Sequence, residues 1–167
     1  MPVKKVIVIG LDGLEPKIVE PMLEHPLVEY IGEIGDHEKD EFLGNAMAML
    51  FPIGWPEPFG LSMIEAMACG TPVIAFPCGS VPEIVEDGVS GFIVNSIEEG
   101  VEAVGRLGML SRERCRQVFE ERFTAERMAR DYVALYERMM QKAGRAVRTS
   151  EHVAAVTVPA TLEWAGR

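Results

Sequence analysis

Two carboxylates, Glu57 and Glu65, lie eight residues apart on either side of Gly60. Gly60 stands where a proline-rich loop gives way to an apolar run that begins at Leu61. Glycine lets a ligand approach the backbone closely, and the unpaired N–H groups of a helix start attract anions. We therefore expect the N–H groups of Gly60, Leu61 and Ser62 to be free for a phosphate. Ionised carboxylates only accept hydrogen bonds, so they would take the hydroxyl protons of a sugar.

The surroundings of Glu65 contain little positive charge. No lysine or arginine occurs from residue 40 to residue 105, so an ion-pair partner for Glu65 must come from distant sequence. A partly buried carboxylate needs hydrogen-bond donors, and the hydroxyl groups of a sugar are the natural alternative to a cation. A purely structural role, in which backbone groups or water satisfy Glu65, is the other interpretation.

Short apolar runs alternate with helical segments along most of the chain. The expected strands are 6–9, 28–31, 47–51, 72–76 and 91–94. The expected helices are 36–46, 61–68, 80–86, 96–107, 111–122 and 124–141. This alternation implies an α/β fold of three layers, with a parallel sheet and right-handed crossovers. Ligands bind such sheets beyond the carboxyl ends of the strands, where the loop 52–60 would lie.

The residues from Glu57 to Val73 read Glu-Pro-Phe-Gly-Leu-Ser-Met-Ile-Glu-Ala-Met-Ala-Cys-Gly-Thr-Pro-Val. They resemble the Glu-x7-Glu signature of retaining GT-B glycosyltransferases of the group 1 type. The similarity covers roughly residues 28 to 140 and includes the segments 30–32, 50–52, 79–83, 87–88 and 91–92. The resemblance implies a Rossmann-like sheet that forms the C-terminal, donor-binding half of a GT-B fold.

The same resemblance assigns roles by position. Glu57 would contact the donor sugar and be the catalytic residue of this half, and Glu65 would hold the ribose hydroxyls. The donor-binding residues would be Glu57, Pro58, Phe59, Gly60, Leu61, Glu65, Gly79 and Ser80. The family transfers a sugar from a nucleotide diphosphate to an acceptor with retention and without a metal. The nucleotide sugar is then a substrate, no cofactor is expected, and the sequence names neither the base, the sugar nor the acceptor.

Group 1 enzymes have two Rossmann-like domains facing a cleft, which requires a considerably longer chain. We therefore expect the acceptor domain to be missing here, together with the first half of the donor domain. That half carries the lysine and arginine that neutralise the leaving diphosphate. We therefore expect an incomplete donor-binding half that is inactive alone, unless a complementing chain supplies the rest. The alternative from another class is a non-catalytic nucleotide- or sugar-binding module.

Two further alternatives concern individual residues. Glu57 and Glu65 could be the acid/base pair of a glycoside hydrolase, whose carboxyl groups flank one bond at about 5 Å or about 6.5–9.5 Å. Ser80 could contact a phosphate, or it could cap the helix that follows it, since Ser80 and Glu83 have capping-box spacing. The loop and strand around Glu57 favour a transferase over a hydrolase.

The N-terminal residues differ from the rest. The segment 6–16 reads Val-Ile-Val-Ile-Gly-Leu-Asp-Gly-Leu-Glu-Pro and resembles the opening strand of alkaline-phosphatase-like phosphodiesterases, in which Asp12 would ligate a metal. No Asp/His cluster accompanies it, so a strand and a tight turn are the simpler interpretation, and no metal site is expected. The expected divisions are a strand and linker at 1–27, the donor-binding region at 28–142 and a mobile tail at 143–167.

Composition narrows the partners and the compartment. The net charge of −10 argues against nucleic acid and anionic lipid surfaces. Three cysteines without a Cys-x-x-Cys spacing indicate reduced thiols, and no apolar run is long enough for a signal peptide or membrane span, so a cytoplasmic protein is expected. An apolar stripe on the last helix, which contains Met128, Tyr132, Leu135 and Met139, would allow a homodimer.

Overall fold

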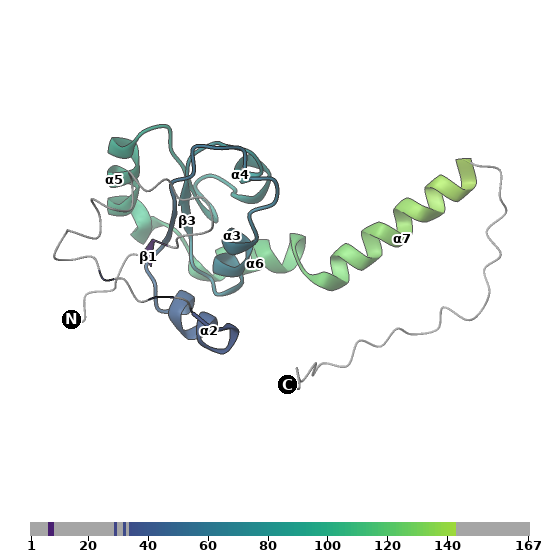
Figure 1. The fold of residues 1–167 in the computed structure, drawn as a ribbon, viewed down its shortest axis with the longest axis horizontal. Helices are drawn as coiled ribbons and strands as arrows, with labels where there is room; N and C mark the ends of the chain where they lie inside the picture. Colours follow the sequence, from purple (N-terminus) through teal and green to yellow (C-terminus); the bar gives the residue numbers. More distant parts are fainter. Residues whose placement is uncertain (1–6, 9–28, 30–31, 33, 143–167) are drawn as a thin grey trace. The chain divides into compact units, whose positions relative to one another are not determined.

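A parallel sheet forms the centre of the computed structural model, which describes residues 7–8, 29, 32 and 34–142 (Figure 1). Its strands are β1 (Ile7–Val8), β2 (Met49–Phe51), β3 (Val73–Ala75) and β4 (Gly91–Ile93). They lie in the order β1-β2-β3-β4, and each neighbouring pair is parallel. The expected α/β class is confirmed, and the carboxyl ends of the strands share one edge of the sheet.

The pairing of β3 with β4 depends on a glycine. Val73 is paired in register with Gly91, and a Cβ added to Gly91 would overlap the carbonyl oxygen of Val73. Every residue of β3 is buried, as expected for a strand covered on both faces. This burial explains why the sequence of this strand is continuously apolar.

Helices cover both faces of the sheet. The helices next to the sheet are α2 (Asp36–Gly44), α3 (Leu61–Ala68), α4 (Val81–Ile84), α5 (Ile97–Arg106) and α6 (Arg112–Arg122), with a 3-10 turn η1 at Leu107–Met109, and the last described helix is α7 (Ala125–Lys142). Right-handed crossovers between parallel strands place α2, α3 and α4 on one face, where α6 also packs against α3. The other face is covered by α5, which packs against β3.

Two apolar clusters separate these layers. The cluster on the α3 face contains Met49, Phe51, Met63, Met67, Cys115 and Val118. The cluster on the α5 face contains Ala48, Ile74, Phe92, Val94, Ala103 and Leu107. Successive residues of β3 enter opposite clusters, as the period of a strand requires. The molecule is therefore the expected three-layer structure.

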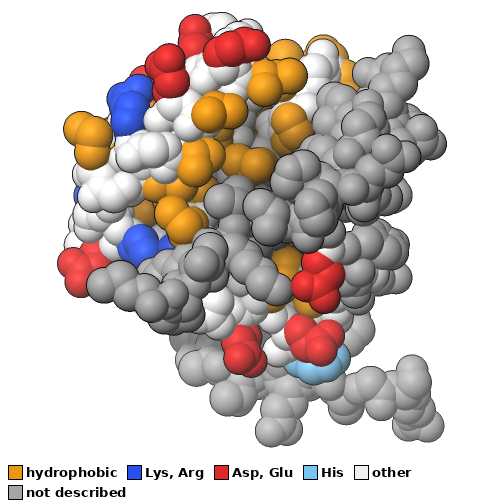
Figure 2. All heavy atoms as spheres, turned by 90° about the vertical axis from the view of Figure 1, so that its left-hand side faces the viewer, with side chains coloured by type: hydrophobic (Ala, Val, Ile, Leu, Met, Phe, Trp, Pro, Cys, Tyr) orange, Lys and Arg blue, Asp and Glu red, His pale blue; other side chains and the backbone are white. Residues whose placement is uncertain are grey.

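The α5 face is less completely buried than the α3 face. On α5, the side chains of Ile97 and Val101 are 73% and 68% exposed. Figure 2 views this side of the molecule and shows hydrophobic side chains gathered on it. Arg106 covers part of the apolar surface, since its guanidinium lies 4.5 Å from the centre of the Phe92 ring. Among the described elements, α5 and the turn η1 contribute to the apolar cluster on this side of the sheet.

Most expected elements are found within a few residues of their predicted bounds. The strand expected at 6–9 is β1 and occupies the edge position beside β2, and the helix expected at 36–46 ends at Gly44. Outside the described residues lie the expected strand 28–31 (apart from Glu29, which is not in a strand), Asp12 and the tail 143–167.

The last helix spans a boundary between two compact units, Met1–Arg127 and Met128–Arg167. No residue of α7 is buried. Its expected apolar stripe is exposed at Met128, Tyr132, Leu135 and Met139. Association through this stripe stays a prediction. Among the described helices, none has the length and apolarity needed to cross a membrane.

Candidate functional site

The loop that follows β2 turns into α3 at Gly60. This glycine is the N-cap of α3 and has a φ of +74°, a conformation that side chains other than glycine rarely adopt. Its carbonyl accepts a hydrogen bond from the Met63 N–H at 3.1 Å. A Cβ at Gly60 would also overlap the Met63 side chain. Glycine therefore sets the direction in which the first N–H groups of α3 point.

The Glu57 carboxylate folds back onto this turn. Its Oε1 accepts hydrogen bonds from the N–H of Phe59 at 3.3 Å and of Gly60 at 3.0 Å. The expectation that the Gly60 N–H is free is wrong, because a carboxylate three residues earlier reaches it. The N–H groups of Leu61 and Ser62 have no acceptor within the helix, as at any helix start. The amide part of the site is thus smaller than the sequence suggested, or it is shared with Glu57.

Gly79 and Ser80 lie against the backbone of Glu57. The Ser80 N–H donates to the Glu57 carbonyl at 2.8 Å. Gly79 has a φ of +58°, and a Cβ there would overlap the backbone of Glu57. The structure therefore brings together three predicted site residues from loops that are more than twenty residues apart in the sequence.

Two serine hydroxyls at this turn are buried without a hydrogen-bond partner among the described residues, those of Ser62 and Ser80. The predicted capping of α4 by Ser80 is wrong: no side-chain capping bond forms, because Ser80 has helical φ and ψ instead of the extended backbone of a cap. The Ser80 hydroxyl instead lies beside Gly60, 3.1 Å from the position that a Cβ would occupy. Ser62 was not predicted as a side-chain donor, although its place in the first turn of α3 could have suggested it.

Glu65 lies one turn further along α3 and has a partner. The Lys39 Nζ is 3.0 Å from Glu65 Oε1, and each side chain is 36% exposed. Lys39 is the last basic residue before the stretch that has none, so the distant partner comes from α2. Lys39, Asp40 and Leu43 of α2, with Glu65 and Ala68 of α3, line a cavity of about 360 Å³.

The outer surface of the loop is apolar. Phe59 and Leu61 are 61% and 59% exposed, and Trp55 is 39% exposed. Pro58 is exposed as well. The side chains of Phe59 and Leu61 are therefore at the surface, although the Phe59 N–H is engaged by Glu57. Trp55 was not predicted, although an aromatic residue in a proline-rich loop is a signal for a surface that contacts a ligand or partner.

Three arginines of α6 donate hydrogen bonds to carbonyls at or near the C-terminal ends of α3 and α4. Arg112 donates to the Cys69 carbonyl at 3.4 Å, and Arg116 donates to the Ala68 carbonyl. Arg122 donates to the carbonyl of Glu83 in α4. Cations stabilise these C-terminal carbonyls through the helix dipole. These three side chains are therefore engaged away from the start of α3. Within the described part of the chain, no group of three or more His, Cys, Asp or Glu residues could hold a metal ion.

A family model described as "Glycosyl transferases group 1" matches residues 2–117. The chain belongs to this family. The match includes the Glu57 to Glu65 segment and the Gly79-Ser80 turn, which lie together in the structure. The sheet is accordingly the C-terminal half of a GT-B fold. The resemblance of the N-terminal segment to phosphodiesterases stays a prediction.

Relatives and solved structures agree with this family. A probable sucrose-phosphate synthase from Thermosipho melanesiensis is 42% identical over 86 residues, which are 49% of this chain and 20% of that protein. An uncharacterized 41.2 kDa protein in the cps region of Klebsiella pneumoniae is 30% identical over 122 residues, 69% of this chain and 34% of that protein. The sucrose-phosphate synthase structure from Thermosynechococcus elongatus superposes with a TM-score of 0.67 at 25% identity, over 83% of this chain and 39% of that one. The chain thus spans about a third or less of the curated relatives described here.

Proposed function

We propose that this chain is the donor-binding part of a retaining, metal-independent glycosyltransferase that uses a nucleotide-diphosphate sugar. The observation that carries the proposal is the assembly around the start of α3. Glu57, Gly79 and Ser80 meet there through a hydrogen bond and a glycine contact. Glu65 lies one turn away on the same helix.

The diphosphate would lie at the amide end of α3. The N–H groups of Leu61 and Ser62, with the dipole of the helix, favour a negative group there. The hydroxyls of Ser62 and Ser80 are buried without partners among the described residues, so each can hydrogen-bond a phosphate or sugar oxygen. The Leu61 N–H is open to the ligand, whereas the Phe59 N–H, which donates to Glu57, would have to be exchanged.

The two carboxylates would hold hydroxyl groups. Glu57 would contact the donor sugar, and its contact with the Gly60 N–H would be exchanged for a contact with the ligand. Glu65 would accept both protons of the ribose diol. Carboxylates repel phosphate. The diphosphate would therefore lie nearer to the amides than to either carboxylate.

A calorimetric titration with UDP, GDP, ADP and their sugar conjugates tests this proposal. Saturable binding of one base is expected, and Glu65→Ala should weaken it at least tenfold, because a hydrogen bond to a charged group contributes about 1.5–3 kcal/mol. Glu121→Ala, which removes a carboxylate from α6, is the matched control and should bind as the wild type does. A folded sample that binds no nucleotide at millimolar concentration would contradict the proposal.

Metal independence has its own test. The same titration with EDTA and with excess Mg²⁺ should give the same affinity if amides and hydroxyls carry the diphosphate. A loss of binding in EDTA would show that a metal shares the charge.

The second candidate, a non-catalytic binding module, is favoured by the distribution of the cations. Arg112, Arg116 and Arg122 bind helix carbonyls, and Lys39 pairs with Glu65. A helix terminus offers only about half a charge against a departing diphosphate. A chain that binds the nucleotide and neither hydrolyses nor transfers the sugar would be such a module. Release of the nucleoside diphosphate on addition of an acceptor would instead show transfer.

A glycoside hydrolase using Glu57 and Glu65 is disfavoured. A hydrolase requires one carboxyl group to donate a proton. Both carboxylates here act as acceptors, one from two backbone N–H groups and the other from Lys39. Membership of the glycosyltransferase family points the same way.

A further inference from the structure

The ion pair between Lys39 and Glu65 joins α2 to α3 at the cavity that both helices line. The Nζ–Oε1 distance is 3.0 Å, and the two side chains are equally exposed at 36%. Exposed ion pairs of this kind contribute little to folding stability. The pair can nevertheless fix the orientation of a carboxylate, because it occupies one of its two oxygens.

Hydrogen bonds fix the C-terminal end of α2, the helix that carries Lys39. Leu43, one turn further along α2 and buried, accepts a 2.6 Å hydrogen bond at its carbonyl from the Thr71 hydroxyl. The carbonyls of Gly44 and Ala46 accept hydrogen bonds from Arg112 at 2.8 and 2.6 Å. Residues four apart lie on the same face of a helix, so Lys39 and Leu43 both face α3. Lys39 is thus presented from a fixed support.

This arrangement leaves part of the carboxylate available. Lys39 donates to Oε1, while Oε2 and the remaining lone pair of Oε1 can still accept hydrogen bonds. A vicinal diol needs a carboxylate turned so that two acceptor sites face it. A cation bound at one oxygen restricts the rotation of that carboxylate.

We propose that Lys39 is a positioning residue that orients Glu65 for the two hydroxyls of a ribose, and that it thereby determines the preference for ribonucleotides. This inference rests on the proposed function, in which Glu65 binds the ribose. Lys39 acts through Glu65, so its removal should affect recognition of the hydroxyls more than recognition of the rest of the nucleotide.

The test compares two ligands in four proteins. Whichever of UDP, GDP and ADP binds is titrated beside its 2′,3′-dideoxy counterpart into the wild type, Lys39→Met, Glu65→Gln and the double variant. The wild type should prefer the ribonucleotide at least tenfold. Lys39→Met should reduce that ratio severalfold, and Lys39→Arg should restore part of it. Loss of the positive charge of Lys39 weakens the binding of both ligands equally through their phosphates. The ratio of the two affinities therefore isolates the effect on the hydroxyls.

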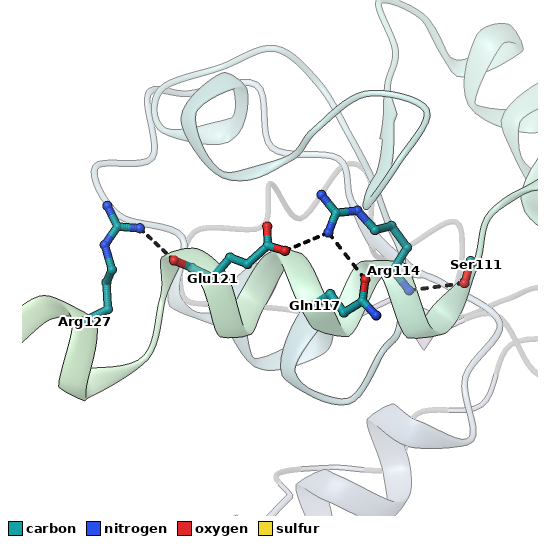
Figure 3. Close-up of polar contacts among 5 residues, drawn as sticks. All are labelled: Ser111, Arg114, Gln117, Glu121 and Arg127. Atoms are coloured by element: carbon teal, nitrogen blue, oxygen red, sulfur yellow. Dashed lines mark hydrogen bonds and ion pairs between the residues drawn. The ribbon is translucent and has the colours of Figure 1, made fainter.

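A matched control is available on α6. Arg114 and Glu121 form an ion pair at 2.9 Å with side chains 42% and 58% exposed, and the contact lies beside the Gln117 and Ser111 contacts of the same helix (Figure 3). Arg114→Met breaks an ion pair of the same kind and should leave the ratio unchanged. In the double variant, the loss of Lys39 should have no further effect on the ratio, because Glu65 is already neutral.

The outcomes separate the two proposals. If Glu65→Gln abolishes the preference for the ribonucleotide but Lys39→Met leaves it intact, the proposed role of Lys39 is wrong and the proposed function still holds. Tighter ribonucleotide binding by Lys39→Met also overturns it, since Lys39 would then compete with the ligand for Glu65. If the wild type binds both ligands with equal affinity and Glu65→Gln does not change this, Glu65 does not bind the ribose. The positioning role of Lys39 is then overturned as well.

Discussion

The two ends of α3 are built in opposite ways. At its first turn, Glu57 accepts from two backbone N–H groups, and the hydroxyls of Ser62 and Ser80 are buried without partners among the described residues. At its last turn, Arg112 and Arg116 donate to the terminal carbonyls. One end therefore has hydrogen-bonding capacity left over, and the other has its acceptors satisfied.

The difference shows where this chain places its positive charge. Cations stabilise a helix at its carbonyl end, and anions are favoured at its amide end. The arginines of α6 fix α3 to the rest of the domain at the carbonyl end. The amide end keeps backbone donors and hydroxyls, which suit a phosphate and a sugar.

The largest expected effect is the loss of the support at the carbonyl end. Arg112→Met removes the hydrogen bonds to the carbonyls of Gly44, Ala46 and Cys69 and to the Thr71 hydroxyl. The free energy of unfolding, measured by urea titration, should fall by about 2–3 kcal/mol, because the carbonyls lose a charged donor. Arg112→Lys keeps the charge but not the planar fork and should recover only part of the loss. An unchanged unfolding midpoint in Arg112→Met would show that this end is not the support.

The next largest effect is expected when the contact between Gly79 and the Glu57 backbone is disrupted. Gly79→Ala places a Cβ on the Glu57 backbone at a φ of +58°, so it should destabilise the fold by about 1–3 kcal/mol and displace Glu57. Gly88→Ala is the matched control, since its φ of +74° is similarly strained but no atom lies within 4 Å of the added Cβ. Nucleotide affinity should fall in Gly79→Ala alone. Equal losses of affinity in both variants would mean that backbone strain, and not the position of Glu57, matters.

The next prediction concerns the pH dependence of folding stability, which should reflect the buried thiol of Cys115 in α6. Burial raises the pKa of Cys115 to about 12 from 9.0, against a smaller opposing effect of Arg112. The raised pKa means that the unfolded chain loses this proton first, so stability is complete below pH 9 and declines as the pH rises towards 12. The decline should be about 1 kcal/mol between pH 9 and pH 10 in urea unfolding. Cys115→Val should show a smaller decline over the same interval, and equal declines would contradict the assignment.

The smallest effect is expected on the outer surface of α6. The hydrogen bond from Arg114 to Glu121 raises the pKa of the arginine, but the two side chains are 42% and 58% exposed. Arg114→Met should leave both the unfolding midpoint and the nucleotide affinity unchanged, because solvent screens such pairs. A clear loss of stability would indicate that the network in Figure 3 contributes more than its exposure suggests.

Local features were predictable because they depend on nearby residues. Gly60 marks the start of α3 through its positive φ, and Cys69-Gly70 marks its end, so the helix was placed correctly from sequence. The apolar run at 72–76 predicted β3 because a strand buried on both faces needs no polar residues.

The partners across the fold were not predictable. Lys39 and Glu65 lie on different helices, and Arg112 reaches carbonyls on segments far away in the sequence. Nothing in the local pattern selects these pairs, since any exposed lysine or arginine could serve. The capping assigned to Ser80 failed as well: its backbone is helical, and its N–H donates to the carbonyl of Glu57 in a distant loop, a contact that the local sequence does not reveal.

An NMR titration of the backbone amides with the nucleoside diphosphate that binds tests the contrast between the two ends of α3 most directly. The account predicts that the amide signals of Phe59, Gly60, Leu61 and Ser62 shift in a saturable manner, while those of residues 68–71 do not. Binding that shifts the signals of residues 68–71 and leaves the first turn unchanged would contradict it.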